Sequence, residues 1–435
     1  MGVKVNSPDL PDALPRKDAA PAASRMTKWW LVLLTAAVGV STILVVSSYR
    51  HAPLEVADDN PASEAAQRPR LLATKPFRAP SGPWGELECL PISLSPPLEL
   101  IPEAAEGGSG KVAWHFPGTD SAGLATLFEK IGLSKSLRGT LVSMAKENRE
   151  IDGSSIYPSR DFVLQLDPES RSALYVALAE HWENADQRSA FRFAADSTDA
   201  WFAASRISAE TRELVAPLIY RYGNYLFFAD LPSIRDALPS AGERLRLLAT
   251  LGRCSTLLVY LEVSRDTDIA SLVDYWGRGN RVREVRPILE AQRRAGGGKI
   301  DVTHLLPPFA RRRLYTYPTP LAEADTLSRD CHWTSLNFFH EVPDDRLADT
   351  TYAVQKVKSE YDRFEGDPRL GDVIFLMNSR EAVIHSAVFI AGGIVFHRTG
   401  RLPSEPWVLV KFADMLDYYP RHEKLDVHYY RRKGA

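Results

Sequence analysis

The chain has 435 residues, of which 45% are hydrophobic and 25% charged, and its formal net charge is −2. This composition excludes a disordered chain, and the near-neutral charge excludes the basic surface typical of a nucleic-acid-binding protein. The length is enough for about two domains beyond any tail or anchor. The three cysteines, Cys89, Cys254 and Cys331, are too few for a disulfide framework, although one bridge is still possible. They also lack the CxxC spacing of a thiolate zinc site, so we expect no metal and no cofactor.

An apolar run without any charge lies near the N-terminus, at residues 29–49. It is long enough to cross a bilayer as a helix, and tryptophan and tyrosine residues stand at its ends. A cleaved signal peptide would have an apolar core of only about 7–15 residues, so a permanent anchor is favoured. Basic residues are more frequent before the run than after it, which predicts a cytoplasmic N-terminus. We therefore predict a single-pass membrane protein with a cytoplasmic, disordered tail at residues 1–28 and its bulk in the periplasm or outside the cell.

The next two segments differ in composition. Residues 50–83 are rich in proline and alanine and predict a linker. Residues 84–314 predict a mostly helical domain, because apolar residues recur there at helical spacing. These sets are Leu124, Leu127, Phe128 and Ile131; Leu174, Ala177 and Leu178; and Leu214, Leu218 and Tyr222. Residues 255–263 are the clearest strand, and a short helix is expected between an Asp268 N-cap and Gly277. This domain shows no set of catalytic residues, and its role is open.

The last segment, residues 315–435, has a different pattern, with short helices followed by strands. A short helix is expected to start at Cys331, and a second one to run from about Asp344 to Tyr361. Alternating and apolar runs then predict strands at 372–377, 382–391, 393–398 and 407–412, followed by a short helix. A helical part followed by an antiparallel meander predicts a small α+β domain.

Three motifs of this last segment resemble the NlpC/P60 cysteine peptidases, which have a papain-like fold. They are RDC at 329–331, GDVIFL at 371–376 and HSAVFIAGGIVFH at 385–397. The resemblance implies that Cys331 is the nucleophile, His385 the base and His397 the third residue of a triad. Tyr317, or Tyr315, stands near the place of a family tyrosine and would have an oxyanion or positioning role. The implied substrates are peptide or amide bonds of cell-wall peptidoglycan, or another extracytoplasmic amide.

The residues around Cys331 support this chemistry independently. A nucleophilic cysteine must react as the thiolate, and the pKa of a thiol falls at a helix N-terminus or beside a histidine. Asp330 is a good N-cap residue and would place Cys331 in the first turn. The backbone amides of that turn would then be able to donate to a developing oxyanion.

The turn between the two histidines decides whether they can meet. A two-residue turn at Gly392-Gly393 would pair Ala391 with Ile394 and put His385 and His397 on opposite faces of the hairpin. A three-residue loop that includes Ala391 would put both on one face. The triad therefore predicts the three-residue loop.

Two residues depart from the family pattern and keep other functions open. His332-Trp333 follow the cysteine where the family has a small Ser-Gly pair, and a bulky indole could narrow or block the cleft. His332 points about 100° away from Cys331 on a helix and is a poor base for it. A metal site made of His332, His385 and His397 is not supported by an HExxH motif or an acidic companion. The alternatives are an inactive NlpC/P60-like binding or scaffold protein and a thiol acyltransferase.

Overall fold

The structure is a computed structural model. It describes residues 70–71, 75–101, 112–194, 197–203, 205–223, 225–318, 329–398, 400, 404–417 and 425–434. The predicted tail at 1–28, the predicted membrane segment at 29–49 and most of the predicted linker lie outside these residues. None of the helices in the described ranges has both the length and the apolar character needed to cross a membrane. The described chain is of the α+β class, with helices and antiparallel sheets.

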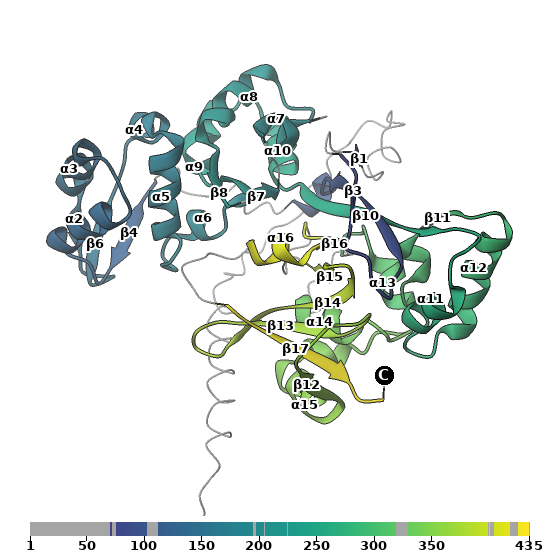
Figure 1. Cartoon of the computed structure of the whole chain (residues 1–435). Coiled ribbons are helices and arrows are strands. Elements are labelled where there is room, and N and C mark those ends of the chain that lie inside the picture. The colour runs from purple at the N-terminus through teal and green to yellow at the C-terminus, as the bar shows by residue number, and fades with distance from the viewer. Residues whose placement is uncertain are drawn as a thin grey trace, which may run out of the picture. The chain divides into compact units, whose positions relative to one another are not determined.

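The first sheet joins the start of the described chain to its middle (Figure 1). Its strands are β1 (Arg70–Leu71), β2 (Phe77–Arg78), β3 (Glu86–Leu94), β10 (Cys254–Val263) and β11 (Gly298–Asp301). The predicted strand at 255–263 is β10, which pairs with β3 along nearly its whole length. β2 pairs with β3 inside the range that we expected to be linker, and Ala79 beside it is buried. The folded part therefore begins before Trp84, because these residues complete a sheet edge.

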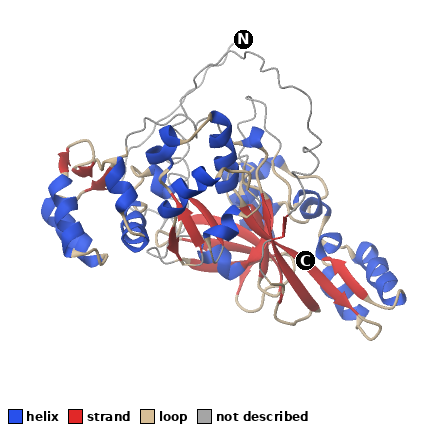
Figure 2. Cartoon of the chain, turned by 90° about the horizontal axis from the view of Figure 1, so that it is seen from above, coloured by secondary structure: helices blue, strands red, loops and turns tan. Residues whose placement is uncertain are grey.

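Helices and two small sheets follow between β3 and β10, so this part is not built of helices alone. Figure 2 shows the helices and strands of the described chain in different colours. The small sheets have the orders β4-β6-β5 and β7-β9-β8. Their strands are β4 (Trp114–Pro117), β5 (Lys146–Asn148), β6 (Gly153–Ile156), β7 (Phe191–Ala194), β8 (Tyr220–Tyr222) and β9 (Tyr225–Phe228). The helices are α2 (Ser121–Lys130), α3 (Lys135–Met144), α4 (Arg160–Gln165), α5 (Pro168–Leu178), α6 (Ala185–Arg188), α7 (Thr198–Phe202), α8 (Ala209–Val215), α9 (Leu231–Ile234) and α10 (Ala241–Leu251).

The predicted helical spacings hold in two of three cases. α5 buries Leu174, Ala177 and Leu178. α2 buries Leu124 and Phe128, while Leu127 is half-buried and Ile131 is the C-cap of the helix. The spacing from Leu214 to Tyr222 was wrong, because α8 ends at Val215 and Tyr222 lies in strand β8. Pro217 follows directly in a short 3-10 turn, and a proline has no N–H to continue an α-helix.

Helices α11 (Ile269–Trp276), α12 (Val282–Arg294) and α13 (Pro308–Arg313) connect β10 and β11 to the last domain. α11 begins after its predicted N-cap, Asp268, whose carboxylate accepts from the amides of Ala270 and Ser271. The last domain contains α14 (Cys331–Leu336), α15 (Thr350–Glu360) and α16 (Phe412–Asp417). The helix predicted from Asp344 is split, because Asp349 ends a 3-10 turn and caps α15.

The sheet of the last domain is antiparallel with the order β12-β17-β13-β14-β15-β16. Its strands are β12 (Tyr361–Phe364), β13 (Val373–Met377), β14 (Val383–Ala391), β15 (Ile394–Arg398), β16 (Trp407–Lys411) and β17 (Asp426–Arg432). The four predicted strands are β13 to β16. β12 and β17 were not predicted, and β17 lies between β12 and β13 although it is last in the chain.

One hydrophobic core crosses the boundary that we predicted at residue 314. Side chains of β3, β10 and α11 pack in it with side chains of α14, β14 and β16. Tyr275 donates a hydrogen bond to the carbonyl of Ile390 at 2.6 Å, and Thr256 Oγ1 donates to that of Leu409 at 2.9 Å. The helical parts around α2–α5 and α7–α10 have cores of their own. The last domain is therefore completed by the first sheet and by α11–α13.

The Gly-Asp motif before β13 has a structural role. Gly371 has a φ of +90°, and a Cβ there would lie 2.0 Å from Phe339 Cε2. Its N–H donates to the carbonyl of Phe389 at 3.0 Å. Asp372 accepts two hydrogen bonds from the guanidinium of Arg431, at 2.6 and 2.9 Å, and so ties β17 to β13.

We expect Gly371→Ala to lower the free energy of unfolding by about 2–3 kcal/mol, through left-handed backbone strain and overpacking against Phe339. Gly366→Ala is the matched control, because Gly366 has a φ of +115° but a Cβ there meets nothing within 4 Å. It should cost only the strain, about 1–2 kcal/mol. Denaturant unfolding of both variants measures the difference, and equal losses would show that Phe339 does not restrict this position.

Candidate active site

Cys331 occupies the first turn of α14. The carboxylate of Asp330 accepts hydrogen bonds from the amides of His332 and Trp333, at 2.9 and 3.1 Å, which makes Asp330 the N-cap. Because this cap uses two of the first-turn amides, the amide of Cys331 itself is the donor left for an oxyanion. The side chain of Cys331 is mostly buried, with 8% of its surface exposed. α14 packs against β14 and β15, the two strands that carry the candidate histidines.

The hairpin between β14 and β15 combines a two-residue turn with a β-bulge. Ala391 pairs with Ile394, so the turn is Gly392-Gly393, and both glycines have positive φ values. The prediction of a three-residue loop was therefore wrong. The register then shifts by one residue at Ile390, so that Phe389 pairs with Val395. The two-residue turn alone would put the two histidines on opposite faces of the hairpin. The bulge shifts the alternation by one residue, so both histidines face the same side.

His385 and His397 are in direct contact. His385 Nε2 lies 3.0 Å from His397 Nδ1, and both side chains are buried. Burial, and then the nearby His397 and His332, lower the pKa of His385 well below its usual value. Burial lowers the pKa of His397 to about 3. Both imidazoles are therefore neutral at physiological pH, and His385 can accept a proton but does not hold one in advance.

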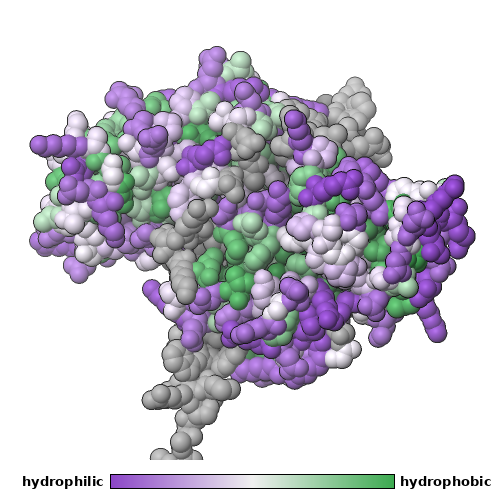
Figure 3. Space-filling model, viewed as in Figure 1, coloured by the Kyte–Doolittle hydropathy of each residue, from purple (hydrophilic) through white to green (hydrophobic). Residues whose placement is uncertain are grey.

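Side-chain alternation on β14 separates two sets of polar groups. Ser386 faces α14, because its Oγ lies 3.0 Å from His332 Nδ1 and 3.1 Å from Ser335 Oγ. His385 faces the opposite side of the sheet, towards α16. It pairs with Leu376, which packs with Ala387 and with the side chains of α16. Apolar residues also gather around α16 on the surface (Figure 3). The pairing of β13 with β14 also has a register shift, between Leu376 and Met377 of β13. It lies opposite the start of β14, beside His385.

Two other candidate residues lie in the hydrophobic interior. Trp333 is fully buried in the core beneath α14, so its indole does not cover Cys331. Tyr317 packs against a cluster of Ile92, Leu94 and Val408, and Val408 is the β16 partner of His397. The Tyr317 hydroxyl is buried and makes no hydrogen bond to any described residue. Tyr315 instead donates to the carbonyl of Leu257.

Sequence reasoning missed the arginines around α14. Arg313, Arg329 and Arg398 stack on the rings of Trp333 and Trp407. The only sequence signal for these contacts was the run of three arginines at 311–313. It did not indicate the stacking, because Trp333 and Trp407 are remote from it in sequence.

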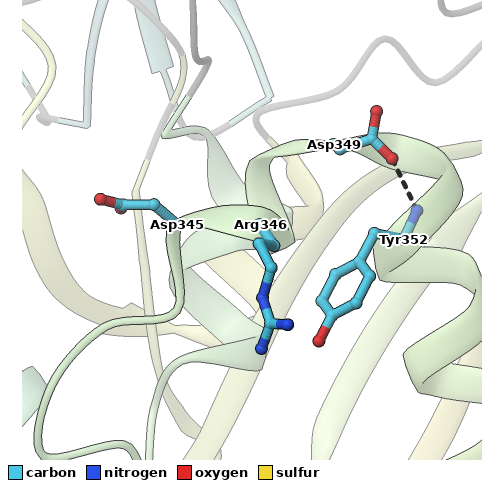
Figure 4. A pocket seen from close by; sticks show the side chains of 4 residues that line it. All are labelled: Asp345, Arg346, Asp349 and Tyr352. Atoms are coloured by element: carbon cyan, nitrogen blue, oxygen red, sulfur yellow. Dashed lines mark hydrogen bonds between the residues drawn. The ribbon is translucent and has the colours of Figure 1, made fainter.

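A pocket lies next to this region (Figure 4), lined by Asp345, Arg346, Asp349 and Tyr352. Asp349 accepts a hydrogen bond from the Tyr352 amide at 2.7 Å, and the Arg346 guanidinium lies 4.8 Å from the centre of the Tyr352 ring. Asp345 points away from Arg346 and pairs with Arg329 at 3.2 Å. Because its polar side chains are engaged with neighbours, we assign this pocket no part in the chemistry.

The described residues contain no group of three or more histidine, cysteine or acidic side chains that could hold a metal ion. All three cysteines are free thiols. No family model matches the chain, and neither a curated protein nor a solved structure was found to match it.

Proposed function

We propose that this protein is a thiol-dependent amide hydrolase in which Cys331 is the nucleophile, His385 the base and His397 the residue that orients it. The observation that carries the proposal is the hydrogen bond between His385 Nε2 and His397 Nδ1, on the two strands against which the Cys331 helix packs. In the tautomer in which His385 Nε2 donates to His397 Nδ1, Nδ1 of His385 is the atom that would take the thiol proton. A base held by a third residue is the usual arrangement for an activated nucleophile.

The proposed reaction begins with a neutral His385. It takes the proton from Cys331, and the thiolate attacks an amide carbonyl. The backbone amide of Cys331 then donates to the developing oxyanion. The protonated His385 gives its proton to the leaving amine, and water hydrolyses the thioester. His397 accepts the Nε2–H of His385 and so selects the tautomer with a bare Nδ1.

The proposal places one demand on the site. α14 meets the sheet through the face of Ser386, whereas His385 belongs to the opposite face. The structure thus brings His385 and His397 together but places Cys331 against the other face of the sheet. The proposed proton transfer therefore requires His385 to turn towards α14 at the start of β14, next to the register shift between Leu376 and Met377. β-bulges occur beside active sites because they re-aim a side chain.

Substrate and location follow the resemblance to the NlpC/P60 peptidases and the predicted membrane segment at 29–49. They suggest peptide bonds of cell-wall peptidoglycan, cleaved outside the cytoplasm by a membrane-anchored enzyme. The low exposure of Cys331 favours a second candidate, a binding or scaffold protein that keeps the domain without the reaction. The two candidates differ in the reactivity of a single thiol.

Alkylation by iodoacetamide, followed at each cysteine of the full-length protein between pH 5 and 9, tests the proposal. Burial raises the pKa of Cys89 to about 11 and that of Cys254 to about 12, so these thiols are unreactive internal references. We expect Cys331 to react at pH 7 at least about 100-fold faster than Cys89, and the rate to fall at least about tenfold in His385→Gln.

The matched control is His304→Gln, because His304 is exposed and remote from this sheet in sequence. It should leave the Cys331 rate unchanged. If Cys331 reacts as slowly as Cys89, or if His385→Gln has no more effect than His304→Gln, the hydrolase proposal fails and the scaffold function is favoured.

A further inference from the structure

We infer that Tyr317 is a further positioning residue of the proposed site, joined to Nε2 of His397 through one buried water. The inference rests on the proposed function and deepens it, because it names what holds the third residue of the triad in place. It also gives Tyr317 a different role from an oxyanion donor, since Tyr317 lies on the side of the sheet that faces away from Cys331.

Two buried polar atoms next to β16 have no protein partner. Nε2 of His397 and the hydroxyl of Tyr317 are both buried, and neither makes a hydrogen bond to any described residue. His397 uses its other ring nitrogen, Nδ1, for the contact with His385. Buried polar groups are nearly always satisfied by protein atoms or by ordered water, so two unsatisfied groups in one region indicate a water that both contact.

Both side chains lie on the same face of the sheet. His397 pairs with Val408 across β15 and β16, so these two side chains point to the same side. Tyr317 packs against the cluster that contains Val408. Val410 packs against that cluster and also against the one that contains Val395, two residues before His397 on β15. Tyr317 therefore faces the side that carries the histidines.

One strand separates Tyr317 from His397. The chain before Tyr317 runs along the side of β16 that faces away from β15. There the Tyr315 amide donates to the carbonyl of Trp407 at 2.9 Å, and the Trp407 amide donates to that of Thr316 at 3.1 Å. Neighbouring strands lie about 4.8 Å apart, so two strand spacings place this segment about 10 Å from β15. A phenol and an imidazole that point towards each other over this distance bring their polar atoms within reach of one water.

The water holds the His397 ring in the orientation that the proposed function needs. A buried water typically makes about three hydrogen bonds to otherwise unsatisfied groups. When it binds Nε2 and the Tyr317 hydroxyl, it keeps Nδ1 turned towards His385. Tyr317 thus acts on His385 through His397, in the way that a third residue orients a catalytic base.

The side-chain nitrogens of His397, observed by NMR in the full-length protein, test the contact directly. His397→Gln assigns the signals. We expect the Nε2 proton of His397 to show a nuclear Overhauser contact with a bound water. Tyr317→Phe keeps the ring and removes only the hydroxyl, so it should abolish this contact and shift the Nε2 resonance.

The matched control is Tyr429→Phe, because Tyr429 packs on the same face of the sheet but on the distant strand β17. It should leave the water contact and the Nε2 resonance unchanged. An Nε2 proton without a water contact, or signals that Tyr317→Phe leaves as they are in the wild type, overturns the inference whatever the reactivity of Cys331.

The iodoacetamide rates of Cys331 show whether Tyr317 acts through His397. We expect Tyr317→Phe to lower the rate at pH 7 about threefold, as for the loss of one hydrogen bond, and His397→Gln to lower it about tenfold. The double variant should react like His397→Gln alone, because the hydroxyl has no effect once its partner is gone.

The outcomes separate this inference from the proposed function. Losses that multiply in the double variant overturn a role through His397 and leave the hydrolase standing. Slow reaction of Cys331 in the wild type overturns the hydrolase, and the NMR signals of His397 then decide whether the water site exists. Unreactive Cys89 in the same samples shows that each variant is folded.

Discussion

Replacement of Asp230 by asparagine is expected to lower the free energy of unfolding by about 3–5 kcal/mol. Asp230 is buried and pairs with Arg171, whose side chain has no exposed surface, and it accepts a hydrogen bond from Tyr175 at 2.5 Å. Burial raises the pKa of Asp230 to about 6, against the opposing effects of Arg171 and Tyr175. The carboxylate is therefore ionised at neutral pH, and its loss leaves a buried guanidinium without a counter-charge.

The hydrogen bonds of Arg171 also hold neighbouring helices together. Arg171 donates to the carbonyls of Val163 and Leu166, at 2.7 and 3.2 Å, so α4, α5 and the start of α9 are tied to one side chain. Loss of Asp230 should therefore loosen these helices together.

Denaturant unfolding at pH 7.5 measures the effect of Asp230→Asn. Glu147→Gln is the control, since Glu147 pairs with Arg149 on the surface with both side chains largely exposed, and it should cost less than about 1 kcal/mol. Replacement of both partners, as Arg171→Met with Asp230→Leu, should recover much of the loss. A cost for Asp230→Asn as small as that for Glu147→Gln would show that water reaches the pair.

Acidification from pH 7.5 to 5.5 is expected to reduce the stability through the two site histidines by roughly 3 kcal/mol in total. The pKa values of His385 and His397 in the folded protein lie below the unfolded value of about 6.5. The unfolded chain therefore binds the additional protons. Stability is complete above pH 6.5 and falls by about 1.4 kcal/mol per pH unit and per histidine as the pH decreases, towards the His397 pKa of about 3.

Variants isolate this part of the pH dependence. His397→Gln should be less stable than the wild type at pH 7.5, but should lose about 1.4 kcal/mol less on acidification to pH 5.5. The exposed His304→Gln should show the same pH dependence as the wild type. Equal slopes for His397→Gln and the wild type would mean that His397 titrates normally in the folded protein and is not buried as described. The same low pKa values predict that a neutral His385 base persists below pH 6.

Much of the local structure near the site could be predicted, because it depends on neighbouring residues. Asp330 identifies the start of α14 since an N-cap acts within one turn. The strands β13 to β16 were predicted with their approximate ends from apolar runs and alternation, and Cys331, His385 and His397 from their motifs. The missed strand β17 has partly buried residues along most of its length, without the apolar run that reveals a core strand.

Only the tertiary structure decided how these parts meet. The sequence allowed two loops between the histidines. The structure has the two-residue turn, and a bulge at Ile390 nevertheless puts both histidines on one face. The bulge could not be predicted locally, because pairing along the whole of β14 and β15 sets the register. The stacking of Arg313 between Trp333 and Trp407 joins three elements that are remote in the chain. The sequence by itself thus determined the candidate residues and the elements that carry them, through short-range capping and alternation. Their contacts were decided by long-range packing, which no local pattern encodes.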